Sequence, residues 1–139
     1  MCGNAITLDA FNRCQIPREA WTHRAHLTIA YLLCRAYPSD GPDGAIERAR
    51  LGIQKSNAAL GIEQTETGGY HDTMTIAWMR VMLAAMRHHG PGDGPDQFLD
   101  QNPHLLARTL LRLYYSKERI MSREARHGWV EPDLAPLPK

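Results

Sequence analysis

Residues 21–37 read WTHRAHLTIAYLLCRAY, and the spacing of their side chains predicts a buried α-helix. One stripe of this stretch has steps of three and four residues and consists of His23, His26, Ala30, Leu33 and Tyr37. Such steps place side chains on one face of a helix. Beyond Leu27 the stretch is apolar on most sides, which is typical of a helix at the centre of a bundle.

The ends of this helix are predicted from prolines. Pro17 suits the first helical position, where its missing N–H group costs nothing. The residue before a proline disfavours the helical conformation, so the helix should end near Ala36 or Tyr37, before Pro38.

Two more helices are predicted downstream. The first runs from about Gly44 to Leu60 as an amphipathic wall, and Gly61 suits a left-handed cap. The second opens near Asp72 or Thr73, either of which can cap it, and runs to about His88. Its inward stripe consists of His71, Met74, Trp78, Val81 and Ala85. A histidine thus stands at the start of an apolar face for a second time.

The remaining segments are shorter. We expect an irregular arm over residues 1–16, a helical turn near 96–100, a helix from Pro103, a last helix over 117–127, and an extended tail over 128–139. No segment has a convincing strand pattern. The prediction is an all-α, single-domain bundle of four to five helices with an extended C-terminal strap. Short linkers favour antiparallel neighbours among the first three helices.

Composition narrows the class of protein. The 139 residues suffice for one domain with a real core, and 43% hydrophobic and 22% charged residues are ordinary for a globular chain. A net charge of +1 gives no sign of nucleic-acid binding. No apolar run approaches a membrane span, and the N-terminus does not resemble a secretory signal. Three widely spaced cysteines fit a reducing compartment, so we expect a cytoplasmic protein.

His23, His26 and His71 form the candidate metal site. Imidazole is a common ligand for zinc, iron, nickel and manganese, and three protein ligands leave a position open for substrate. If the two histidine-bearing helices run parallel, their N-terminal ends can meet. The alternative is a set of hydrogen-bonded core histidines without metal.

Asp72 and Glu66 are the candidate catalytic carboxylates. Either can act as a metal ligand or as a general base. A plain helix cap is the alternative role for Asp72.

Six residues are candidates for substrate binding: Trp21, Tyr70, Trp78, Tyr115, Arg119 and Arg126. The first three can form an aromatic wall beside the histidines, or simply part of the core. Arg119 and Arg126 lie seven residues apart on one predicted helix face and can bind an acidic group, although a solvated face paired with glutamates explains them equally.

Several motifs carry a resemblance to known proteins. They are HxxHL at 23–27, YHDT at 70–73 followed by Trp78, NPHLL at 102–106, YS at 115–116, residues 122–126, and PDLAPLP at 132–138. On these motifs the chain resembles a group of small, mostly uncharacterised bacterial helical proteins, which implies no particular activity. It is also similar to DinB-like bundles, which hold a divalent metal with three histidines. The close histidine pair here is HxxH on the first helix, whereas those bundles have a late HxxxH.

Three functional hypotheses follow. The first is a small metal-dependent enzyme that acts on a small molecule, which can be anionic. The second is a metal-free helical module that binds a small molecule or another protein, and the third is a metal-free acid–base enzyme using His26 and Asp72. A homodimer through the apolar sides of the second or fourth predicted helix is compatible with each.

Overall fold

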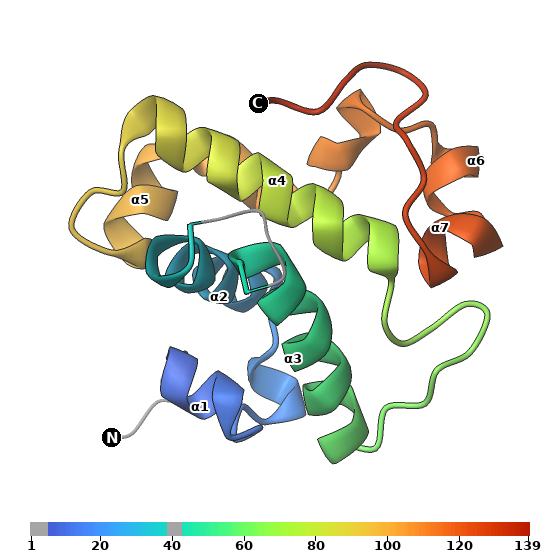
Figure 1. Cartoon of the computed structure of the whole chain (residues 1–139), viewed down its shortest axis with the longest axis horizontal. Coiled ribbons are helices and arrows are strands. Elements are labelled where there is room, and N and C mark those ends of the chain that lie inside the picture. The colour runs from blue at the N-terminus through green and yellow to red at the C-terminus, as the bar shows by residue number, and fades with distance from the viewer. Residues whose placement is uncertain (1–5, 39–42) are drawn as a thin grey trace.

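Helix α2 (His23–Ala36) is surrounded by the other main helices, α3 (Ala45–Ala59), α4 (Asp72–His89) and α5 (Pro95–Gln101). The computed structural model describes residues 6–38 and 43–139, and all regular elements in these ranges are helical (Figure 1), which confirms the all-α prediction. The shorter elements are α1 (Leu8–Asn12), η1 (Arg18–Ala20), η2 (Pro103–Leu106), η3 (Leu110–Leu113), α6 (Lys117–Ile120) and α7 (Arg123–His127).

Helix α2 begins later than the proline predicts. Pro17 opens only the 3-10 turn η1, and α2 starts after Thr22, whose side chain accepts a hydrogen bond from the N–H of Ala25 at 3.1 Å. Threonine is a strong N-cap because this bond satisfies a free N–H of the first turn. His23 is therefore the first residue of α2.

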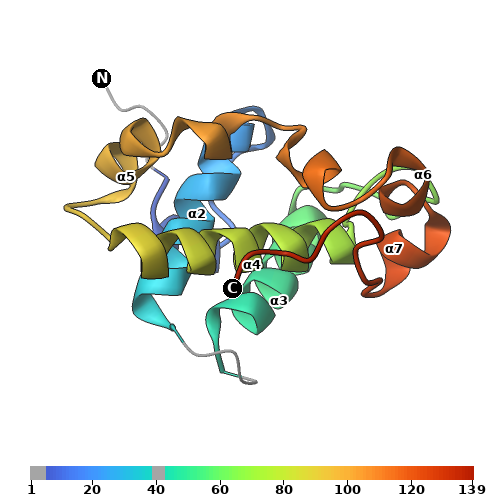
Figure 2. The ribbon, with the colours of Figure 1, turned by 90° about the horizontal axis from the view of Figure 1, so that it is seen from above.

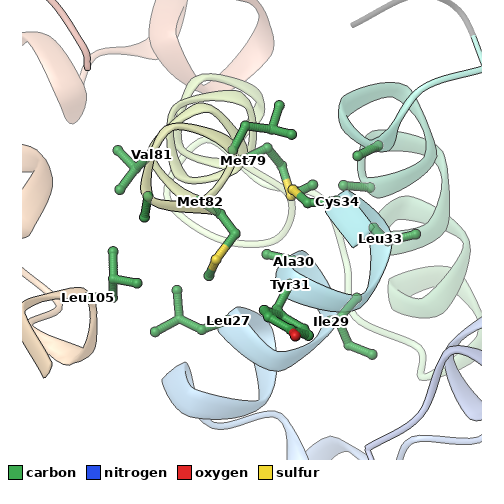
Figure 3. Close-up of a cluster of buried hydrophobic side chains, with 14 of the residues drawn as sticks. Leu27, Ile29, Ala30, Tyr31, Leu33, Cys34, Met79, Val81, Met82 and Leu105 are labelled. Atoms are coloured by element: carbon green, nitrogen blue, oxygen red, sulfur yellow. The ribbon is translucent and has the colours of Figure 1, made fainter. Parts of the chain in front are cut away.

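The three central helices do not form a simple up-and-down array. Figure 2 shows α2 running steeply across α4, so these helices cross and do not have the parallel arrangement that was one condition for the histidines to meet. Their apolar faces meet at the crossing (Figure 3), where Leu27 and Ala30 of α2 lie near Met79 and Met82 of α4. Leu105 of η2 is fully buried beside them.

The segments at both ends of the chain differ from the prediction. The expected irregular arm contains α1, whose Phe11 is 2% exposed, and residues 1–5 of that arm lie outside the described residues. The predicted helix from Pro103 is instead two 3-10 turns. The predicted last helix is divided into α6 and α7 because the Ser122 side chain caps a new helix, accepting from the N–H of Ala125 at 3.2 Å.

The C-terminal strap, residues 128–139, has no helix and packs along the same chain, as predicted. The carboxylate of Asp133 accepts hydrogen bonds from the N–H and hydroxyl of Ser116 at 2.8 and 2.7 Å. The hydroxyl of Thr73 donates to the carbonyl of Gly128 at 2.6 Å. These bonds fasten the strap to α4 and to the η3–α6 turn. No helix in the described ranges is long and apolar enough to cross a membrane.

Candidate functional site

A pocket of about 380 Å³ opens where α2, α3 and α4 meet. Its lining includes five of the predicted site residues: His23, His26, Tyr70, His71 and Trp78. The remaining walls are mostly apolar, with Leu27 and Ala30 from α2 and Met74 and Met79 from α4. Mostly apolar walls with a few convergent polar groups are typical of small-molecule sites.

The ring of His23 is fixed in the wall of this histidine pocket. Its Nε2 donates to the carbonyl of Leu105 at 3.1 Å, and its ring meets Trp78 edge-on with centroids 5.0 Å apart. Because a carbonyl oxygen only accepts, Nε2 carries the proton in the neutral ring and Nδ1 is left as an acceptor. Burial lowers the pKa of His23, the bond to Leu105 opposes this, and the charge of Arg108 adds to the lowering.

His26 is the free imidazole of the pocket. Among the described residues its ring nitrogens have no hydrogen-bond partner, and the ring lies against Trp21 at a tilt of 36° with centroids 4.7 Å apart. Surrounding protein atoms lower the pKa of His26 to about 4, and the neighbouring His23 and Arg108 contribute. The ring is nevertheless exposed to water at the pocket mouth, which opposes this lowering. At neutral pH it is therefore an uncharged donor and acceptor.

His71 has a structural role at the start of α4. Its Nδ1 accepts the N–H of Met74 at 3.1 Å, and its Nε2 donates to the carbonyl of Ile120 at 2.8 Å. The ring is thus the N-cap of α4, where Asp72 or Thr73 was expected. Burial lowers the pKa of His71, so the ring stays neutral and keeps both bonds. Neither nitrogen remains for a metal ion.

The predicted metal trio stays a hypothesis, and it would require His71 to release its bond to Met74 or to Ile120. In the described part of the chain, no group of three or more His, Cys, Asp or Glu side chains is placed to hold a metal ion. The nitrogens left unbonded are Nδ1 of His23 and both nitrogens of His26. These histidines are three residues apart on α2, so their side chains share one helix face.

Asp72 is buried and is held in a partly buried network with Tyr70 and Arg50. The Asp72 carboxylate accepts from Nε and Nη2 of Arg50 at 2.9 and 3.3 Å and from the Tyr70 hydroxyl at 2.6 Å. Burial and the hydrogen bond to Asp72 raise the pKa of Tyr70. Both carboxylate oxygens are thus occupied, and Asp72 positions Tyr70 in the pocket wall.

The other predicted residues lie elsewhere. Glu66 is exposed and pairs with Arg123 at 3.3 Å. Tyr115 is fully buried and donates its hydroxyl to the carbonyl of Val130 at 2.7 Å, while Nε of Arg119 donates to the carbonyl of Glu131 at 2.5 Å. Tyr115 and Arg119 therefore hold the strap and do not line the histidine pocket. Arg126 lines an adjoining hollow.

Helix α3 contributes more to the site than its sequence indicated. Ile53 and Asn57 line the histidine pocket, and Arg50 holds Asp72. The nearest signal was the spacing of Glu47 and Arg50, which pair at 2.8 Å one turn apart. That spacing is a signal for a salt bridge within α3. It gives no sign of the second salt bridge, from Arg50 to Asp72 of α4.

Comparison with known proteins assigns neither a family nor a function to the chain. No protein-family model, curated protein or solved structure gives a significant match to the chain.

Proposed function

We propose that the histidine pocket binds a small, largely apolar molecule, with His23 and His26 as the polar groups that select it. The observation that carries this proposal is the unbonded state of the nitrogens of His26 and of Nδ1 of His23, inside a pocket with mostly apolar walls. A polar group in such surroundings gains from a ligand that replaces weakly held water.

The protonation and hydrogen-bonding capacity of the two imidazole rings indicate which ligand the pocket would bind. With lowered pKa values, both imidazoles are uncharged at neutral pH. Nδ1 of His23 accepts a proton donor such as a hydroxyl or an amide N–H, and His26 can donate or accept. Leu27, Met74 and Trp78 offer contact to an aliphatic or aromatic body.

The test is a fragment screen read by thermal shift and ligand-observed NMR on four proteins. They are the wild type, His23→Leu, His26→Leu and, as matched control, His104→Leu, since His104 is exposed and outside the pocket lining. Hits with a hydroxyl or amide should lose roughly tenfold in affinity in His26→Leu, as expected for one hydrogen bond. Equal affinity for all four proteins would contradict the proposal.

A metal-dependent enzyme is the second candidate, favoured by the unbonded Nδ1 of His23 and the unbonded nitrogens of His26 on one face of α2. His23 and His26 would supply two ligands, and His71 would have to give up its bonds to Met74 or Ile120 to supply a third. A bound divalent ion would polarise a substrate oxygen or activate water.

Elemental analysis of protein purified without chelator, beside His23→Ala and His26→Ala, tests this second candidate. About one zinc, iron, nickel or manganese ion per chain, lost in both variants, would support it. Protein that stays metal-free after incubation with these ions would exclude it and leave the metal-free pocket.

A further inference from the structure

A second hollow, of about 360 Å³, adjoins the histidine pocket. The two share Asn57, Ile62 and Tyr70 in their walls, so Tyr70 stands at their boundary. The walls of the second hollow differ in character, because charged and amide side chains line it: Arg50, Gln54, Gln64, Asp72, Arg126 and His127. We call it the polar hollow.

The charges in the polar hollow are unevenly compensated. Arg50 is held by two carboxylates, Asp72 at 2.9 Å and Glu47 at 2.8 Å. Arg126 has no carboxylate partner among the described residues, and its Nη1 only reaches the carbonyls of Gly69 and Tyr70, at 3.4 and 3.5 Å. A guanidinium has five N–H donors, so Arg126 keeps several for an anion.

We infer that the ligand of the histidine pocket is an amphipathic monocarboxylate, whose apolar body enters that pocket and whose carboxylate binds Arg126 in the polar hollow. This inference rests on the proposed function, because it places the body of the ligand in the histidine pocket. Arg126 is one cation without a carboxylate partner among the described residues, so a ligand with a single negative charge matches it. A dianion such as a phosphate monoester would add repulsion from Asp72, which lines the same hollow.

The position of Tyr70 supports a ligand that spans both hollows. The Tyr70 hydroxyl donates to the Asp72 carboxylate at 2.6 Å. The Tyr70 carbonyl accepts a hydrogen bond from Nη1 of Arg126 at 3.5 Å, as the carbonyl of Gly69 does at 3.4 Å. The same residue thus orients one wall of the histidine pocket and lies beside the free guanidinium. A carboxylate at Arg126 would therefore lie beside Tyr70, a residue that also lines the histidine pocket.

The test compares ω-phenylalkanoates, from phenylacetate to 5-phenylpentanoate, with their uncharged primary amides by isothermal titration calorimetry. The proteins are wild type, Arg126→Gln, Arg126→Lys and the control Arg123→Gln, whose exposed side chain pairs with Glu66. The best acid should bind the wild type roughly tenfold tighter than its amide. That preference should vanish in Arg126→Gln, persist in part in Arg126→Lys, and remain unchanged in Arg123→Gln.

Other outcomes separate this inference from the proposed function. Acids and amides that bind equally well, and lose affinity equally in His26→Leu, would overturn the carboxylate site and leave the histidine pocket intact. An acid preference that survives in Arg126→Gln would also overturn it. Failure of every acid and amide to bind, while fragments from the screen still bind with an affinity that depends on His26, would overturn the carboxylate inference alone. Failure of both series would contradict the proposed function as well.

Discussion

Replacing His71 by alanine distinguishes a structural histidine from a metal ligand. In the structure the ring makes two bonds to backbone, to the N–H of Met74 and to the carbonyl of Ile120. Loss of an N-cap costs about 1 kcal/mol. A buried carbonyl left without its donor costs about 1–3 kcal/mol more. We therefore expect His71→Ala to lower the free energy of unfolding by about 2–4 kcal/mol.

The measurement is urea denaturation followed by circular dichroism, with EDTA present throughout, so that no metal contributes. His71→Asn should recover about 1 kcal/mol, because asparagine is a good N-cap but has no ring to reach Ile120. His104→Ala should change stability by less than about 0.5 kcal/mol, as an exposed site usually does. If His71→Ala in EDTA also lowered the free energy of unfolding by less than about 0.5 kcal/mol, the capping role would be refuted. His71 would then again be a candidate metal ligand.

Three further changes test the packing and charges around the site. Gly52→Ala should destabilise the chain by about 1 kcal/mol in the same denaturation assay, because the new Cβ would lie 2.2 Å from the Phe11 ring. This overpacking should outweigh the gain in helix propensity that alanine brings. A more stable variant would contradict the close contact between Gly52 and Phe11. Asp72→Asn should lower stability by about 2 kcal/mol and lower the pKa of Tyr70, read by ultraviolet pH titration; an unchanged tyrosine titration would refute the network. Surrounding protein atoms lower the pKa of His26 from about 6.5 toward about 4 in the folded chain, and exposure at the pocket mouth limits that shift. The unfolded chain therefore binds more protons just below pH 6.5, and stability should fall as the pH drops through this range. His26→Leu should flatten that fall, and an identical pH profile would contradict the lowered pKa.

The all-helical fold was predictable because the apolar stripes are long and regular. The stripe from His23 to Tyr37 identified α2, and Gly61 and Pro38 marked helix ends within about two residues. Shorter elements were not predictable in detail. Thr22 and Ser122 cap helices where the sequence offers several serines and threonines, and only tertiary contacts decide which one is used.

The histidine pocket was predictable in its residues and not in their bonds. His23, His26 and His71 do line one pocket, but the sequence could not show that His71 meets Ile120, 49 residues away. Histidine is not among the preferred N-caps, so residue type gave no sign of this role. Arg50 was likewise assigned to a plain helix wall because its partner Asp72 lies on another helix.

Methyl NMR of methionine-labelled protein tests the central claim most directly, because Met74 and Met79 line the histidine pocket while Met121 is 56% exposed and outside its lining. On titration with the best-binding fragment or phenylalkanoate, the signals of Met74 and Met79 should shift together and saturate, and that of Met121 should stay in place. The same titration of His26→Leu should require roughly tenfold more ligand. Shifts confined to Met121, or no saturable shift at Met74 and Met79, would contradict a binding site between α2, α3 and α4.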